Sequence, residues 1–322
     1  MDSKRQKVFT DWTSDTAAQW GRKPLRLAHS WHTDPLFSLD SLASLIERYP
    51  VSEYALVRTG KRGEQGPERD KRRWREGEIG ALNGREVIDA IGRGGMWLNL
   101  RNVHTLDARY AALLNAAHDE LSQHMPGFAP SALRMGILVS SPDAQVHFHA
   151  DLPGQALWQI AGAKRVYLYP PRAPYLPPQV LEQIAMTALE VGIPYDPAFD
   201  ADATVFDLLP GQMLHWPLNA PHRVDNLNVV NISVTTEYWT PEIRRSQMVT
   251  VANGVLRRHL GLSPDGRHLS GPGFWAKAVL QAAWRRSPWA RRERRLQRPV
   301  DFRLVHDAPD GWVDIAPIYR AQ

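Results

Sequence analysis

Short apolar or alternating runs follow one another between residues 131 and 239, separated by Pro, Gly, Asn and Asp. A period of two over such short runs is typical of strands with one buried face. One segment with helical spacing, 177–192, interrupts them. Many short strands with turn signals between them predict a mainly β fold, of the double-sheet jelly-roll kind.

Both flanks of this region show other patterns. Apolar positions at helical spacing predict helices over 39–46 and over 107–125, the second capped by Asp107. Residues 94–100 predict a strand between them. The charge-dense segment 60–78 has little to bury, and we expect an exposed loop there.

The pattern becomes helical again after Trp239, most clearly over 249–262 and 274–286. We therefore expect a β core with helical flanks. The expected regions are 1–129, a helical and irregular lead-in with the first strands; 130–240, the jelly-roll core; and 241–322, a C-terminal helical, arginine-rich region.

Composition narrows the chemistry. The chain has 322 residues, 43% of them hydrophobic, which is enough for a substantial core. No run of 18 apolar residues and no apolar stretch behind the charged start are present, so we expect no membrane span, no secretory signal and a cytoplasmic location. The absence of cysteine excludes disulfides, thiolate zinc sites and iron–sulfur clusters. Any metal must be held by His, Asp, Glu or neutral oxygen donors.

Positive charge gathers near the C-terminal end, although the formal net charge is only +5. Such a run is more often a solvated helix face than a nucleic-acid site. The arginines concerned are Arg285, Arg286, Arg291, Arg292, Arg294, Arg295 and Arg298.

Candidate metal ligands lie where the strand-like runs meet turns. Residues two apart in a strand point to the same side, so His149 and Asp151 present a nitrogen and a carboxylate to one point. Iron(II) in oxygen-activating sites is held by two imidazoles and one carboxylate, with other positions left open. His222, which follows a proline-rich turn and leads into a further strand, is the expected third ligand.

These segments resemble the JmjC-type branch of the cupin superfamily, the iron(II) and 2-oxoglutarate dioxygenases related to the hypoxia-inducible-factor asparaginyl hydroxylase. The resemblance rests on His149-x-Asp151, an apolar run into Gly-x-Lys164-Arg, and a Pro-Gly turn before His222. It covers roughly residues 130 to 240 and is faint in the helical flanks.

The resemblance implies a hydroxylase that binds Fe(II) and 2-oxoglutarate and oxidises a protein or peptide side chain. Lys164, 13 residues after Asp151, stands where this branch binds the far carboxylate of 2-oxoglutarate. Gln155 and Thr236 are the further expected cosubstrate contacts. An ammonium inside a barrel is costly unless it meets an anion, and that carboxylate is such an anion.

Three residues depart from the family pattern. Val146 stands where the asparaginyl hydroxylase has a threonine that helps to hold 2-oxoglutarate, Gln212 replaces the usual turn aspartate, and Thr236 falls about where many members have asparagine. These departures leave the three expected metal ligands unchanged.

A competing ligand set uses His147. General cupins use His-x-His and a later His, which here gives His147, His149 and His222, with Gln155 in place of a glutamate. Spacing alone does not choose between the sets. Charge favours Asp151, because a divalent ion in a low-dielectric barrel prefers an anionic ligand. His147 is then either a neighbour that supports the ligands or a substrate-facing group.

Other expectations concern His215, partners and alternative functions. His215 is expected in the pocket wall. The alternative function is that of a metal-binding cupin that is not an oxygenase and acts as a sensor or regulator. In that case the basic C-terminal region could contact nucleic acid. A homodimer through the C-terminal helices is favoured over nucleic-acid binding. The apolar side of those helices is expected to contain Leu256, Leu260, Val279 and Leu280.

Overall fold

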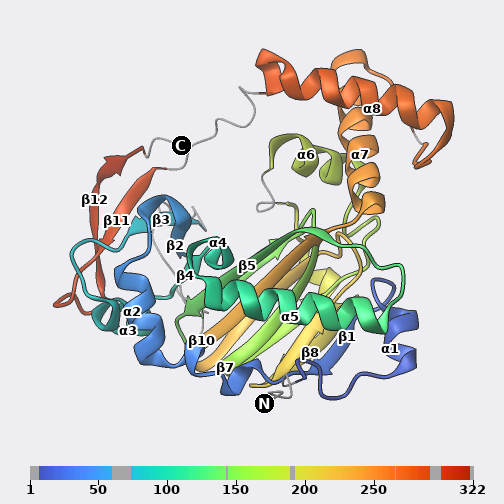
Figure 1. The fold of residues 1–322 in the computed structure, drawn as a ribbon. Coiled ribbons are helices and arrows are strands. Elements are labelled where there is room, and N and C mark those ends of the chain that lie inside the picture. The colour runs from blue at the N-terminus through green and yellow to red at the C-terminus, as the bar shows by residue number, and fades with distance from the viewer. Residues whose placement is uncertain are drawn as a thin grey trace.

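The computed structural model describes residues 7–59, 74–142, 144–188, 193–264, 266–290 and 299–319. Within these ranges twelve strands form one continuous hydrogen-bonded sheet, and helices cover part of it (Figure 1). The strand order is β1-β9-β7-β10-β5-β4-β2-β3-β11-β12, with β6 paired to β10 and β8 paired to β7. The strands are β1 (Leu25–Ala28), β2 (Tyr54–Arg58), β3 (Arg75–Glu78), β4 (Met96–Leu100), β5 (Ser131–Ser140), β6 (Gln145–His149), β7 (Gly154–Leu168), β8 (Thr204–Leu208), β9 (Gln212–His215), β10 (His222–Trp239), β11 (Val300–Leu304) and β12 (Trp312–Ile318).

Helices precede, interrupt and follow the central strands. The α-helices are α1 (Ser14–Gln19), α2 (Leu39–Glu47), α3 (Gly84–Arg93), α4 (Val103–Leu106), α5 (Ala108–His124), α6 (Pro178–Thr187), α7 (Pro241–Leu260) and α8 (Gly271–Arg286). Short 3-10 helices are η1 (Trp31–Thr33), η2 (Pro35–Phe37), η3 (Val51–Glu53) and η5 (Pro197–Asp202). The helices expected over 39–46 and 107–125 and the strand expected over 94–100 are thus confirmed. Asp107 caps α5 by accepting the Arg109 backbone N–H at 3.0 Å.

In each of the two longest strands, β7 and β10, the side chains that face the inside of the barrel switch from one set of alternate residues to the other partway along the strand. Their mutual register shifts between Leu227 and Ile232, and β7 bends at Gly162, whose φ is +74°. A side chain at 162 would also meet the Val230 carbonyl oxygen at 2.8 Å, so only glycine fits the bend. Because of this bulge, the two halves of each strand belong to two facing sheets.

One hydrophobic cluster lies between the facing sheets and is called the inner core here. It consists of Leu157, Val166, Leu168, Leu208, Leu214, Trp216, Ala220 and Val224. Leu157 comes from the first half of β7, whereas Val166 and Leu168 come from its second half. A shared core between two sheets that are joined by the same strands is the jelly roll, so the predicted fold class is confirmed.

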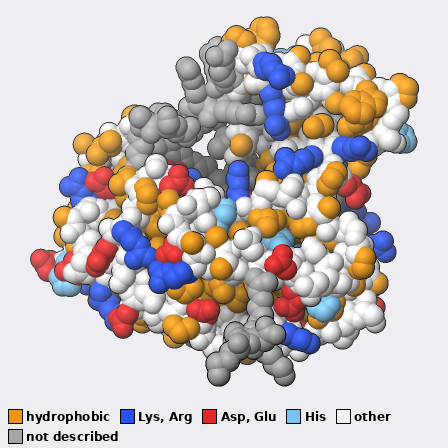
Figure 2. Space-filling view, viewed as in Figure 1, with side chains coloured by type: hydrophobic (Ala, Val, Ile, Leu, Met, Phe, Trp, Pro, Cys, Tyr) orange, Lys and Arg blue, Asp and Glu red, His pale blue; other side chains and the backbone are white. Residues whose placement is uncertain are grey.

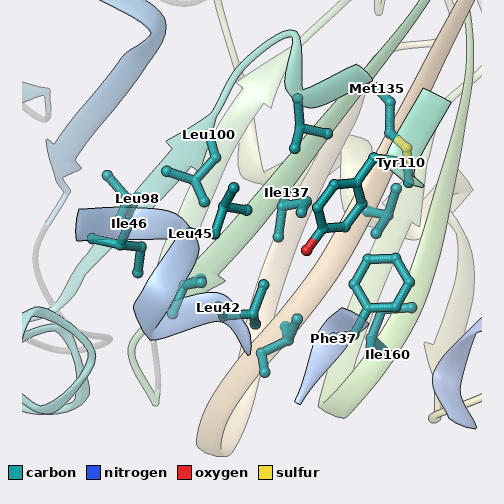
Figure 3. Close-up of a cluster of buried hydrophobic side chains, with 14 of the residues drawn as sticks. Phe37, Leu42, Leu45, Ile46, Leu98, Leu100, Tyr110, Met135, Ile137 and Ile160 are labelled. Atoms are coloured by element: carbon teal, nitrogen blue, oxygen red, sulfur yellow. The ribbon is translucent and has the colours of Figure 1, made fainter. Parts of the chain in front are cut away.

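A second, larger cluster, called the helix-covered core here, packs on the outer face of β4, β5, β7 and β10. Figure 3 shows side chains of α2 and α5 facing those of β4 and β5. Labelled members are Phe37, Leu42, Leu45, Ile46, Leu98, Leu100, Tyr110, Met135, Ile137 and Ile160. This packing fixes the back of the sheet and leaves its inner face for a site.

The helices α6, α7 and α8 form an arm that stands beyond one end of the sheet (Figure 1). Thr240 caps α7 by accepting the Ile243 backbone N–H at 3.2 Å, and Gly261 ends it with φ +64°. The arm has its own small core, and the buried carboxylate of Glu182 on α6 bonds to Arg257 on α7 at 2.9 Å. The α6 helix is the predicted insert; residues 189–192 lie outside the described residues.

The C-terminal region, expected to be helical and arginine-rich, contains strands as well as helices. After α8 the chain forms β11 and β12, and β11 runs parallel to β3, so both strands extend the sheet. Phe302 is fully buried and lies against Gly77, where any Cβ would collide with its ring. Residues 75–78 are therefore a strand and not part of a loop, while 60–73 lie outside the described residues. No helix in the described ranges combines the length and apolar character needed to cross a bilayer.

Candidate metal centre

The three predicted metal ligands come from two paired strands. His149 is the last residue of β6, Asp151 follows two residues later, and His222 is the first residue of β10. In the β6–β10 pair, His149 lies directly opposite His222. Cross-strand partners have neighbouring side chains, so the register alone brings the two imidazoles together.

Distances show that one ion can reach all three side chains. The Asp151 carboxylate lies 3.3 Å from His222 Nε2 through Oδ2 and 3.9 Å from His149 Nε2 through Oδ1. The two imidazole centroids are 4.1 Å apart. Ligand atoms of the three residues all lie within 4.8 Å of one another. Two nitrogens and one carboxylate are the donors of the open iron site that the sequence predicts.

Hydrogen bonds set the tautomer of both histidines. His149 Nδ1 lies 2.8 Å from the His147 carbonyl oxygen, and His222 Nδ1 lies 3.0 Å from the Ala220 carbonyl oxygen. A carbonyl only accepts, so each Nδ1 carries the proton and each Nε2 directs its lone pair to the centre. Burial, and next the neighbouring His149, lower the pKa of His222 to about 4, so its imidazole is neutral near pH 7.

Asp151 has an oxygen without a partner. Its Oδ2 is buried and accepts no hydrogen bond among the described residues. Burying a carboxylate oxygen in this way is costly unless a cation compensates it. The orphaned oxygen therefore fits a divalent ion at the point where the three ligands meet.

Asn219 links the two loops that carry the ligands, a role that the sequence gave no signal for. Its side-chain Nδ2 donates to the Asp151 backbone carbonyl at 2.6 Å, and its backbone is left-handed with φ +60°. The residue thereby holds the turn before His222 against the loop after His149. It is a positioning residue for the metal site.

Replacing Asn219 by glycine is expected to weaken metal affinity by about ten- to a hundredfold, the usual cost of losing an outer partner of the ligands. Glycine keeps the left-handed backbone and removes only the amide. Titration with Mn(II), followed by electron paramagnetic resonance, measures the affinity. Asn102→Gly is the matched control, because Asn102 is also left-handed, with φ 55°, and its amide bonds to Glu53. Equal affinities in the two variants would contradict the positioning role.

The competing ligand set is not brought together. Among the described residues, the convergent group contains His149, Asp151 and His222 and does not include His147. His147 serves this group through its backbone carbonyl, which fixes the His149 ring. The geometry thus supports the set with the carboxylate.

Lys164 lies deeper in the barrel, on the face of β7 that carries Val166 and Leu168 into the inner core. The register places it beside Asn226 of β10 and Leu208 of β8. Its side chain is 3% exposed. Leu168 is level with His222, and four residues of strand separate it from Lys164, a distance of about 13 Å. A lysine side chain and a five-carbon dicarboxylate together can bridge that distance.

The Lys164 ammonium has no counter-charge in the part of the chain that the structure describes. No ion pair or hydrogen bond to Nζ is found there, and burial alone lowers its pKa to about 7. A buried ammonium without an anion is costly. Lys164 is thus placed to receive an anionic ligand that enters the barrel from the metal end.

The other predicted site residues divide between the two faces of the sheet. Gln155 shares the inner face with Leu157, so it stays a candidate cosubstrate contact. Thr236 lies on the opposite face, where it accepts a hydrogen bond from Trp158 Nε1 at 2.9 Å. We therefore do not retain Thr236 as a cosubstrate contact. Adjacent residues of a strand point to opposite faces of the sheet. A prediction that is off by one residue along the strand therefore names a side chain on the wrong face.

His215 was also expected on the wrong face. Its ring stacks on Trp20 at 3.8 Å between centroids, behind the sheet, and its Nδ1 bonds to the Gln155 carbonyl at 2.7 Å. It is not part of the pocket wall. Gln212, one of the departures from the family pattern, accepts the Leu209 backbone N–H at 3.0 Å through its side-chain oxygen and so stabilises the turn that an aspartate usually holds.

Two charged residues at the mouth of the barrel were missed by sequence reasoning. Glu237 of β10 lies between Arg134 of β5 and Gln155 of β7 in the strand register. Burial, followed by the nearby Asp151 carboxylate, raises the pKa of Glu237. The alternation of side chains along 231–239 would have indicated that Glu237 faces inward. This requires knowing whether the odd-numbered or the even-numbered residues of that segment face the inside of the barrel.

The chain is similar in fold to solved structures of other proteins. The X-ray structure of Escherichia coli YcfD has a TM-score of 0.51 and 20% identity, with 88% of this chain and 70% of that chain covered. YcfD described as a ribosomal oxygenase in complex with cobalt and 2-oxoglutarate has a TM-score of 0.50 and 21% identity, with 89% and 70% covered. No protein-family model and no curated protein matches the sequence. These likenesses confirm the fold that the resemblance to the JmjC-type branch implies.

Proposed function

We propose that the chain is an Fe(II)- and 2-oxoglutarate-dependent oxygenase that hydroxylates a side chain of a protein or peptide. The observation that carries this proposal is the pairing of two features in one barrel. His149, Asp151 and His222 converge at its mouth, and the uncompensated ammonium of Lys164 lies further inside. A dicarboxylate that chelates a metal at one end and needs a cation at the other fits both.

The residues fit the two absent groups. His149 and His222 offer neutral Nε2 atoms and Asp151 offers the anionic oxygen, which leaves other coordination positions open. Iron(II) together with 2-oxoglutarate supplies the oxidising chemistry, which couples decarboxylation of the cosubstrate to hydroxylation. Lys164 holds the far carboxylate, and the inner core excludes water from the reacting end. The solved neighbour that is described with cobalt and 2-oxoglutarate supports this choice of ligands.

The direct test is iron-dependent formation of succinate from 2-oxoglutarate by the purified chain, without added substrate. We expect slow succinate formation that requires Fe(II) and stops when a chelator is added. A chain that binds Fe(II) but neither binds 2-oxoglutarate nor releases succinate would instead be the metal-binding sensor or regulator. That alternative leaves the buried Lys164 charge without a use.

For the substrate and the cellular location we propose only the general class. A protein or peptide substrate is supported by the description of the Escherichia coli neighbour as a ribosomal oxygenase. A cytoplasmic location stays a prediction. Nucleic-acid contact also stays a prediction, because most of the arginine cluster, residues 291–298, lies outside the described residues.

A homodimer through the C-terminal arm is the partner that the surface supports. On α8, Trp275 and Val279 are 63% and 69% exposed and lie four residues apart, so they form one outward stripe. Trp289 just beyond it is 66% exposed. Figure 2 shows hydrophobic side chains gathered on the arm above the body of the molecule. Exposed apolar residues that lie together support an interaction surface on this arm.

Val279→Glu is expected to convert a dimer into a monomer, because it places a carboxylate inside the proposed helix–helix contact. Size-exclusion chromatography with light scattering measures the mass. Val51→Glu is the matched control, since Val51 is 58% exposed and lies in η3, away from the arm. A wild-type mass of one chain, about 36.4 kDa, at micromolar concentration would contradict the dimer.

A further inference from the structure

A groove of about 220 Å³ lies between the C-terminal arm and the end of the barrel that carries the candidate metal centre. The helices α6 and α7 of this arm stand beyond that end of the sheet (Figure 1). On the barrel side the groove is lined by Leu152, Leu218 and Asn219. On the arm side it is lined by Leu181, Ala185, Ile243, Ser246, Gln247 and Thr250.

The barrel side of the groove belongs to the two loops that carry the metal ligands. Leu152 follows Asp151 directly, and Asn219, three residues before His222, donates its hydrogen bond to the Asp151 carbonyl oxygen at 2.6 Å. Consecutive Cα atoms are about 3.8 Å apart, so the groove begins next to the metal centre. An extended polypeptide that presents one side chain to the metal advances roughly 3.3 Å per residue. A side chain two or three positions further along it then reaches the groove.

Most of the groove surface is aliphatic. Leu181, Ala185 and Ile243 are buried, whereas Leu152 and Leu218 are only half-buried, so part of their apolar surface faces water. Covering such a surface with another apolar group is favourable by the hydrophobic effect. Pockets for drug-sized ligands measure roughly 300–1,000 Å³, and this groove is smaller. Its size fits one branched aliphatic side chain.

Two polar side chains of α7 are available to whatever enters the groove. Among the described residues, no hydrogen bond is found to the Ser246 hydroxyl or to the Gln247 amide, and Ser246 uses only its backbone carbonyl, which accepts from Thr250 Oγ1 at 2.9 Å. Each residue of a polypeptide backbone offers one donor and one acceptor, and an amide side chain can pair with both. This combination of an aliphatic surface and free backbone-pairing groups fits a peptide segment better than a small apolar molecule.

We propose that the groove is a subsite for an aliphatic side chain of the polypeptide substrate, two or three residues away from the side chain that is oxidised. The inference rests on the proposed function and deepens it, because it names a class of residue that flanks the reacting one. The occupant is a substrate chain because the same two loops form the metal centre and the groove, so a chain that reaches the first passes the second.

The test uses two peptides that differ in polarity at one position. The acetylated heptapeptide amides Gly-Ser-Gly-Leu-Gly-Ser-Gly and Gly-Ser-Gly-Asn-Gly-Ser-Gly have central side chains of nearly the same size, and only the first is aliphatic. Each is titrated into the full chain loaded with Mn(II) and 2-oxoglutarate, and 4-methylpentanamide is titrated as the side chain without a peptide. Line broadening by Mn(II) of the probe protons reports both affinity and closeness to the metal.

The variants fill the groove from α7. Ser246→Leu and Thr250→Leu lie one helical turn apart and place an aliphatic side chain where the probe is expected. Ser44→Leu is the matched control, because Ser44 is an exposed serine within the helix α2. Mn(II) affinity checks that each variant keeps the metal centre folded.

We expect wild type and Ser44→Leu to bind the leucine peptide about tenfold or more tightly than the asparagine peptide. We expect 4-methylpentanamide to bind about threefold or more weakly than the leucine peptide, because it lacks the backbone hydrogen bonds. In Ser246→Leu and Thr250→Leu the two peptide affinities are expected to agree within about twofold, with Mn(II) binding unchanged.

Equal affinities of the two peptides in wild type, or a leucine preference that survives in both filled variants, would overturn the inference and leave the proposed function standing. The inference also falls if 4-methylpentanamide binds as tightly as the leucine peptide, which would make the groove a site for a small apolar molecule. A change of molecular mass in both filled variants, measured by light scattering, would assign the groove to a second copy of the chain instead. A wild-type chain that binds neither Mn(II) nor 2-oxoglutarate would overturn the proposed function as well.

Discussion

Replacing Asp151 by alanine is expected to abolish iron-dependent succinate formation and to weaken metal binding by more than about a hundredfold. Loss of an outer partner already costs ten- to a hundredfold, and Asp151 is the anionic donor of the proposed set itself. Its removal leaves two neutral imidazoles, which bind a divalent ion poorly in a low-dielectric barrel. The fold is expected to persist, because the side chain contributes an uncompensated buried oxygen to the metal-free protein.

Mn(II) titration and succinate release measure the two losses, and circular dichroism checks the fold. His147→Ala is the matched control, because it removes a neighbouring imidazole and keeps the backbone carbonyl that orients His149. We expect it to retain metal. If His147→Ala loses the metal and Asp151→Ala keeps it, the competing set of His147, His149 and His222 is the correct one.

Replacing Lys164 by methionine is expected to have opposite effects on binding and on stability. Affinity for 2-oxoglutarate falls by about a hundredfold or more, because the far carboxylate then enters a barrel without its cation. Metal affinity is unchanged. In the ligand-free protein the free energy of unfolding rises by about 1–4 kcal/mol near pH 6, since a shape-matched apolar side chain replaces a buried, unpaired ammonium.

The sign of the pH dependence separates this effect from simple repacking. Burial lowers the pKa of Lys164 from 10.5 to about 7, so the folded state binds fewer protons than the unfolded state between these values. Wild-type stability therefore contains a contribution that rises with pH from about 7 to 10.5, and the methionine variant lacks it. Urea unfolding at pH 6 and pH 10 measures the difference. Lys23→Met, at an exposed lysine, serves as control. A stability gain that is equal at both pH values would contradict the buried charge.

The sequence predicts the parts of the site that depend on short-range spacing. His149 and Asp151 lie on one side because residues two apart in an extended strand do so. The inward direction of Lys164 was predictable only from the family resemblance, because the bend of β7 at Gly162 changes which residues of that strand face inward. The jelly-roll fold class was predictable because many short apolar or alternating segments are separated by turn residues. The helices over 39–46 and 107–125 were predictable because their apolar periods and caps are local.

Three of the failures depend on where a strand changes face. Thr236, His215 and Glu237 lie on strands whose inward parity is set by the bulge between Leu227 and Ile232 and by the pairing of β9 with β7. Neither is visible in a local pattern. The strands β11 and β12 were missed because the arginine run before them dominates the composition there. Their partner β3 lies more than 200 residues upstream, at Arg75–Glu78.

The strand β10 spans 18 residues and carries His222 as its first residue and Glu237 near its last. One strand thus carries a proposed metal ligand and the Glu237 carboxylate to the same opening, and the register shift between Leu227 and Ile232 sets which face Glu237 takes relative to His222. Inserting one residue at that kink would leave the imidazole untouched and turn the acidic group to the rear. The length of this bulge therefore decides which side chains of the second half of β10 face the opening, without any change to the proposed metal ligands.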